Sequence, residues 1–199
     1  MFQSPEAVYD CLAITKNLEE IFNGVTHQEI QRLSFLACII SLFAQRPTSE
    51  WGYTFSHTKY GTPFSSSLSF AMESLVSSGV LKVHEDRHTL SEKGQATFRF
   101  MTSQSFHESR SPYIEAACGS AAALPPGTLA RGLNNEPTVF ANTLRDSGSR
   151  LLSGAAIQLL YEHFHGLKEA LPDSASDLLS PAVLWLLYVS NESLSERLE

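Results

Sequence analysis

Apolar residues return at helical spacing through most of this chain, and the first two helices are the clearest. Between Pro5 and Gly24, apolar side chains recur every three or four positions, and the proline occupies the first helical position, where its missing N–H costs nothing. A second apolar face begins behind the capping box of residues 26–29 and runs to Pro47. The pattern predicts two amphipathic helices, of which the second is long and well buried.

Between Glu50 and Phe100 the spacing of apolar residues changes several times. Short alternating runs, a turn rich in glycine and proline, and one helical stripe follow in tight succession. They predict a strand over 50–55, a turn over 60–63, a helix over 65–78, a hairpin of strands 80–83 and 88–90 with a charged tip at 85–87, and a further helix from 91 through 100. The order helix, strand, helix, hairpin, helix predicts a winged helix, with residues 65–78 in the position of the recognition helix.

The chain beyond this region is helical and interrupted by breaks. Residues 102–111 are polar and contain four serines, which predicts a surface linker. Helices are then expected over 113–124, around Leu129, over 137–145, over 151–171 and over 176–188. The expected fold is mostly α with a small β-hairpin wing. Its expected parts are an N-terminal helix and winged-helix domain (1–101), a linker (102–111) and a helical C-terminal region (112–199).

Composition and cysteine usage favour a cytoplasmic location. With 199 residues and 43% apolar composition, it is long enough for one or two compact domains. Cys11, Cys38 and Cys118 lie far apart and form no C-x-x-C pair, which indicates reduced thiols. Residues 1–10 lack the pattern of a secretory signal, and the longest apolar run, 181–189, is too short to span a membrane. We therefore expect a cytoplasmic protein without membrane contact.

No motif in the sequence predicts catalytic chemistry. The histidine pair at 84 and 88 flanks a hairpin tip without a cysteine to complete a zinc site, and the pair at 163 and 165 points to different faces of a helix. Cys118 has no family signature around it, and its small neighbours favour a buried structural thiol. Glycine-rich phosphate loops are absent. We expect no enzyme, no cofactor and no metal site.

Charge argues against a protein that coats DNA. The formal net charge is −7, and residues 47–100 hold five basic against five acidic side chains. The expected recognition helix carries no Lys, Arg, Asn or Gln, the side chains that make most base-edge contacts. Contacts with the DNA backbone remain open to hydroxyls and nearby cations. The candidates are Lys59, Ser65, Ser66, Lys82, Arg87 and Lys93.

The apolar run near the C-terminus offers a different candidate surface. A helix that is apolar on every side must be covered by its own domain or by another chain. Trp185 and Tyr188 lie three residues apart, and large aromatic side chains are enriched at interface hot spots. The candidate partner interface consists of Leu184, Trp185, Leu187 and Tyr188. Whether these residues form core or interface stays open at this point.

Three short motifs resemble the winged-helix pattern of YwgA-like proteins. They are Phe55-x-x-x-Lys59-Tyr60-Gly61-x-Pro63-x-Ser65, the helix end from Leu75 to Leu81 around Gly79, and His88-Thr89-Leu90-Ser91-Glu92-Lys93-Gly94. All three are structural motifs. Thr62 departs from the pattern because it separates the glycine of the turn from the proline.

An acidic winged helix followed by a helical extension is similar to the small middle component of ABC-three-component defence systems, the Lamassu type included. In those systems such a subunit sits beside an SMC-like ATPase and a separate effector. The resemblance implies a non-enzymatic accessory subunit that assembles with these partners and meets DNA mainly through the complex, in antiphage defence. The alternative is a stand-alone winged-helix DNA-binding regulator or antitoxin, which is expected to be a homodimer.

Overall fold

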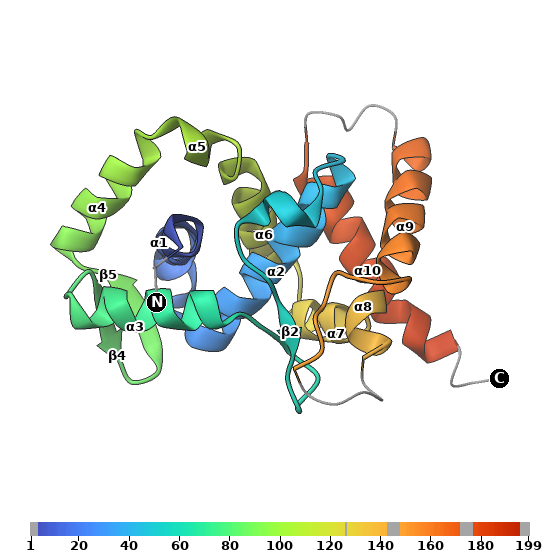
Figure 1. The fold of residues 1–199 in the computed structure, drawn as a ribbon, viewed down its shortest axis with the longest axis horizontal. Coiled ribbons are helices and arrows are strands. Elements are labelled where there is room, and N and C mark those ends of the chain that lie inside the picture. Colours follow the sequence, from blue (N-terminus) through green and yellow to red (C-terminus); the bar gives the residue numbers. More distant parts are fainter. Residues whose placement is uncertain (1–3, 126, 143–147, 172–176, 196–199) are drawn as a thin grey trace.

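The structure is a computed structural model that describes residues 4–125, 127–142, 148–171 and 177–195 (Figure 1). It is mostly helical with a small antiparallel sheet, as the hydrophobic pattern predicts. The helices are α1 (Pro5–Phe22), α2 (His27–Phe43), the 3-10 helix η1 (Thr48–Trp51), α3 (Ser66–Ser77), α4 (Glu92–Thr102), α5 (Ser105–Glu108), α6 (Ser111–Ala123), α7 (Thr128–Asn134), α8 (Pro137–Phe140), α9 (Ala156–Ala170) and α10 (Leu179–Ser195). The strands are β1 (Val25–Thr26), β2 (Ser56–His57), β3 (Pro63–Phe64), β4 (Leu81–His84) and β5 (Arg87–Leu90).

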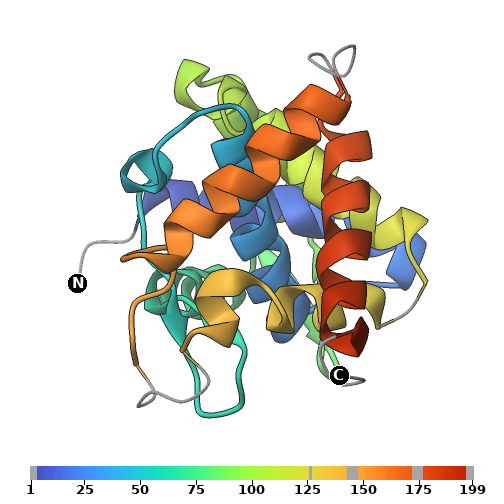
Figure 2. The same ribbon diagram turned by 90° about the vertical axis from the view of Figure 1, so that its right-hand side faces the viewer.

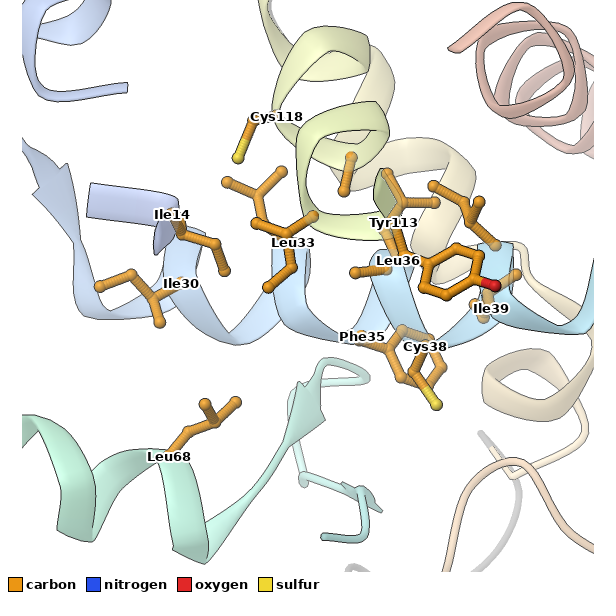
Figure 3. Packing of buried hydrophobic residues seen from close by; sticks show 14 of the residues in the cluster. Ile14, Ile30, Leu33, Phe35, Leu36, Cys38, Ile39, Leu68, Tyr113 and Cys118 are labelled. Carbon is orange, nitrogen blue, oxygen red and sulfur yellow. The ribbon is translucent and has the colours of Figure 1, made fainter. Parts of the chain in front are cut away.

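Helix α2 forms the centre of the core. Every residue from Ile30 to Phe43 is buried except Arg32. Figure 3 shows Leu33 and Leu36 directed toward α6, whereas Phe35 and Cys38 point to the opposite side of the helix. The capping box expected over residues 26–29 is confirmed, because the Thr26 hydroxyl accepts from the Glu29 N–H while the Glu29 carboxylate accepts from the Thr26 N–H.

The expected hairpin is confirmed and joins a third strand. β4 pairs antiparallel with β5, with Leu81 opposite Leu90, and β5 also pairs with β1, so the strand order is β1-β5-β4. Gly24 makes the turn from α1 into β1 with φ of +96°, and a Cβ there would lie 3.0 Å from the Cβ of Arg87. A glycine is therefore required where the first helix meets the sheet.

The strand expected over 50–55 is wrong. Residues 48–51 form η1, Gly52 adopts a left-handed φ of +88°, and the two-residue strand β2 begins only at Ser56. Trp51, Tyr53 and Phe55 are all buried and pack edge to face in sequence. Their alternation reflects aromatic rings that enter the core from an irregular segment, which imitates the period of a strand. The expected turn is confirmed between β2 and β3, with Gly61 at φ of +74°.

The segment expected as a surface linker, 102–111, contributes two buried side chains, His107 and Arg110. His107 stacks on Tyr9 of α1 with 4.0 Å between ring centroids, and Arg110 is 5% exposed and pairs with Asp10. One hydrophobic cluster draws residues from both sides of the segment, from Ala7 to Val189. Polar composition misled the prediction because Arg110 has its ionic partner a hundred residues earlier in the chain.

The last helices differ from expectation mainly at their ends. Left-handed φ angles at Leu152 and Gly154 delay the start of α9 to Ala156, and α10 runs on to Ser195. Residues 143–145 and 176, which were expected in helices, lie outside the described residues. Figure 1 shows α3, β4, β5 and α4 at one end of the molecule and α9 and α10 at the other. Within the described ranges, no helix is both long and apolar enough to cross a membrane.

Candidate functional site

The outward face of α3 is the first candidate surface. Leu68, Ala71 and Leu75 are buried on the inner face of α3. Phe70, which is 38% exposed, and Glu73, which is also exposed, lie on its outward face. No Lys or Arg occurs among the twelve residues of α3. This face therefore offers one carboxylate and one aromatic ring rather than cations.

A polar cluster fixes α3 against α2. The Gln31 side chain accepts from the Ser65 N–H at 2.8 Å and donates to the Ser65 carbonyl at 3.1 Å. The same amide donates to the Ser69 hydroxyl, which also lies 3.0 Å from His27 Nε2. Partial burial lowers the pKa of His27, so its ring is held neutral in this contact. The position of α3 thus depends on groups buried under its first turn.

The serines expected as DNA-backbone contacts divide into one buried and one exposed residue. Ser65 is 1% exposed, so the prediction that it contacts DNA is wrong. It is buried because its backbone N–H and carbonyl are both held by Gln31 at the start of α3. Ser66, the next residue, is exposed.

The four basic candidates also differ in their surroundings. Lys59, Lys82 and Lys93 are exposed, although Lys93 donates to the Ser78 carbonyl at 2.8 Å and Lys59 lies over the Tyr60 ring. Arg87 is half-buried and donates to the carbonyls of Phe22 and Gly24. Arg87 therefore holds the hairpin to the end of α1, and three lysines remain as exposed cations among these candidates.

Buried titratable groups elsewhere serve the fold. Burial raises the pKa of the Cys11, Cys38 and Cys118 thiols, which keeps all three protonated. His88 on the hairpin contacts the Val25 carbonyl at 3.1 Å through Nδ1. In the part of the chain that the structure describes, no group of three or more His, Cys, Asp and Glu side chains could hold a metal ion.

Asp10 and Arg110 form a buried ion pair with a network of hydrogen bonds around it. Arg110 donates from Nε to Asp10 Oδ1 at 2.9 Å and from Nη2 to Oδ2 at 2.5 Å, while Nη1 donates to the Trp51 carbonyl at 2.7 Å. The Tyr53 hydroxyl donates to Asp10 as well, and the guanidinium lies 3.8 Å from the Trp51 ring centroid. This network joins α1, η1 and the start of α6, and its partners are satisfied within the chain.

A groove between α8, α9 and α10 is the second candidate surface. Its volume is about 770 Å³, and Figure 2 shows α9 and α10 diverging toward α8. The residues that line it are Asn135, Pro137, Phe140, Leu159, Glu162, His163, Gly166, Leu167, Ala170, Trp185 and Tyr188. The volume falls in the range of small-molecule sites, and the lining is largely apolar.

The residues expected to form a partner interface occupy two different places. Trp185 is 2% exposed and its ring centroid lies 5.5 Å from that of Phe164, so of the two possibilities left open by the sequence, core and interface, it belongs to the core. It lines the groove because α10 turns this side toward α9. Tyr188 is 49% exposed and also lines the groove, whereas Leu184 and Leu187 are exposed outside it.

Sequence reasoning missed Glu136, which lies beside the groove. Its carboxylate caps α8 by accepting from the Thr138 and Val139 N–H groups and from the Thr138 hydroxyl. The side chain is fully buried, and burial raises its pKa to about 7. The Glu-Pro pair at 136–137 was the available signal, since an acidic N-cap before proline marks a helix start.

Glu136 should make stability depend on pH. Its folded pKa lies above the usual value of 4.5, so its contribution is fully present below pH 4.5 and is lost as pH rises through 7. Relative to Glu136→Gln, the unfolding free energy of the wild type should fall by about 3 kcal/mol between pH 4 and pH 8. Urea titrations of both proteins at several pH values measure this difference, and a difference that does not change with pH would contradict the raised pKa of the buried Glu136 carboxyl.

Comparisons of this chain with protein-family models, with curated proteins and with solved structures found no match.

Proposed function

We propose that residues 5–102 form a winged helix to which α6–α10 are an extension. The order α1, β1, α2, α3, β4, β5 with the sheet order β1-β5-β4 supports this, since the hairpin closes on the strand that follows the first helix. In that arrangement α3 occupies the recognition position and the β4–β5 turn is the wing.

We further propose that the protein is a non-enzymatic accessory subunit of a larger DNA-associated assembly. The proposed partners are an SMC-like ATPase and an effector, as in ABC-three-component defence systems. The observation that carries this proposal is the outward face of α3, which presents Phe70 and Glu73 where a DNA reader places Arg, Lys, Asn or Gln. Such a face is suited to a protein surface, since aromatic side chains are enriched at interfaces and carboxylates repel phosphates.

The stand-alone DNA-binding regulator is the alternative, and the exposed lysines favour it to a limited degree. Lys59, Lys82 and Lys93 are exposed and belong to the turn, the wing and the helix that surround α3. Three phosphate contacts would give weak, salt-sensitive binding without sequence preference.

Selection from a random duplex DNA pool, followed by fluorescence anisotropy, separates the two functions. We expect no enriched sequence and a Kd weaker than about 10⁻⁶ M at physiological salt. Replacement of the three lysines by alanine should reduce even this weak binding. A selected sequence bound with a Kd near 10⁻⁸ M, with a salt slope that the same variant lowers, would establish the regulator instead.

A further inference from the structure

We propose that the groove between α8, α9 and α10 binds one amphipathic helix of a partner protein, with the apolar face of that helix in the groove and Lys or Arg beside it. This inference rests on the proposed function in one respect, namely that the helix belongs to a protein with which the chain assembles.

The shape of the groove is that of a trough between two helices. Along α9 its lining recurs at Leu159, Glu162 and His163, Gly166 and Leu167, and Ala170, which is one residue or pair per turn. At 1.5 Å per residue, this wall is about 17 Å long, or three helical turns. Trp185 and Tyr188 form the facing wall. A three-turn helix has the length to fill such a site through residues at i, i+3 or i+4, and i+7.

Gly166 keeps the middle of the trough open. It lies inside α9, its φ is not left-handed, and a Cβ at this position would meet nothing within 4 Å. Neither the backbone nor the packing of this chain therefore requires glycine, although glycine costs about 1 kcal/mol relative to alanine inside a helix. What glycine provides is room for a second backbone to approach α9, and Ala170 one turn later is also small.

Several apolar side chains that line the groove are partly exposed. Phe140, Leu159 and Tyr188 all line it and are each exposed by more than two-fifths of their surface. Such clustering is typical of a binding site. Trp185 also lines the groove, but its side chain is only 2% exposed and its indole N–H is buried. An occupant with an apolar face would cover this surface.

Charge selects the kind of helix. Among the described lining residues, Glu162 is the side chain that carries a formal charge, and its carboxylate is exposed. The formal net charge of the whole chain is −7. Lys168 on the same helix does not offset it at the groove, since its amine lies over the Phe43 ring on the side toward α2. A helix flanked by Lys or Arg is therefore complementary, and an acidic helix is disfavoured.

The test uses a display library of random peptides of about sixteen residues, long enough for four helical turns. The purified full chain is the bait, and Gly166→Leu is the counter-bait, because a leucine there fills the trough while raising helix propensity. We expect enriched peptides with apolar residues at helical spacing and flanking Lys or Arg. On binding, the NMR signal of the Trp185 indole N–H should shift and that of Trp51 should stay in place.

Affinities of one synthesised peptide for four variants then test the assignment. Gly166→Leu should weaken binding by at least about tenfold, and Glu162→Lys by about threefold or more. The matched controls are Leu187→Ala on the outer side of α10 and Glu169→Lys on α9 outside the lining, and both should bind as the wild type does. Circular dichroism of each variant verifies its fold.

Several outcomes would overturn the inference. The first is that no enriched peptide loses binding in Gly166→Leu, or that the enriched peptides are extended or acidic. The second is that the Trp185 signal does not change on binding. The third is that the wild type is a dimer that Gly166→Leu dissociates, which would assign the groove to a second copy of the chain. If the peptide experiment fails but an ATPase assembly is recovered from the cell, only the assignment of the groove is refuted. Groove-dependent helices without any assembly in the cell refute the proposed function and leave the site intact.

Discussion

Replacement of Arg110 by methionine is expected to destabilise the protein by about 3–5 kcal/mol, because the change leaves a charged carboxylate buried without its partner. Asp10 is fully buried, and Arg110 supplies two of its hydrogen bonds. Methionine keeps much of the aliphatic volume, so the loss reports the ion pair rather than a cavity. Urea unfolding at neutral pH measures the effect.

The pH profile and a double variant identify the cause. Burial raises the pKa of Asp10 and the Arg110 guanidinium opposes this shift, so the pKa rises further without Arg110. A raised folded pKa contributes stability at low pH that is lost as pH increases, so the deficit of Arg110→Met should shrink in acid. Asp10→Leu combined with Arg110→Met should recover most of the loss. A double variant as unstable as the single one would show that the pair is not the cause.

Replacement of Trp185 by alanine should destabilise the isolated protein by about 3–5 kcal/mol, as for other buried tryptophans. The side chain is 2% exposed and packs against Phe164. Leu184→Ala, one residue earlier on the same helix, is the matched control, because Leu184 is 42% exposed and should change stability by less than about 0.5 kcal/mol. Thermal unfolding of the two variants separates core from surface on α10.

The opposite results for these two variants would change the assignment of each residue. If Trp185→Ala unfolds like the wild type but no longer assembles with its partner, Trp185 is an interface anchor and does not belong to the core. If Leu184→Ala instead lowers stability by more than about 2 kcal/mol, Leu184 is not exposed and the outer side of α10 is covered in solution.

Local signals along the chain were sufficient for the elements that depend on neighbours in sequence. The capping box at 26–29 and the tight turn at Gly61 need only nearby residues, and both are present. The strand expected over 50–55 failed because buried aromatic side chains alternate there without pairing to another strand. Period alone does not distinguish a strand from an irregular segment whose alternate side chains enter the core.

Features that depend on distant residues were not predictable from sequence. Arg110 lies in a serine-rich polar segment, and its partner Asp10 is a hundred residues away. The groove needs three helices to diverge, and the glycine at 166 shows its use only when their placement is known. Trp185 and Tyr188 had the same apolar signature, yet one is core and the other half-exposed, since burial depends on which side of α10 faces α9.

The proposed role of this chain as a subunit of a larger ATPase assembly can be tested in the native host. Affinity purification of the tagged protein from its native host at moderate salt, followed by native mass spectrometry, tests it most directly. We predict recovery of a large ATPase in a fixed ratio to the chain. Recovery of a homodimer alone that retains duplex DNA would contradict the role as an ATPase subunit and establish a DNA-binding regulator.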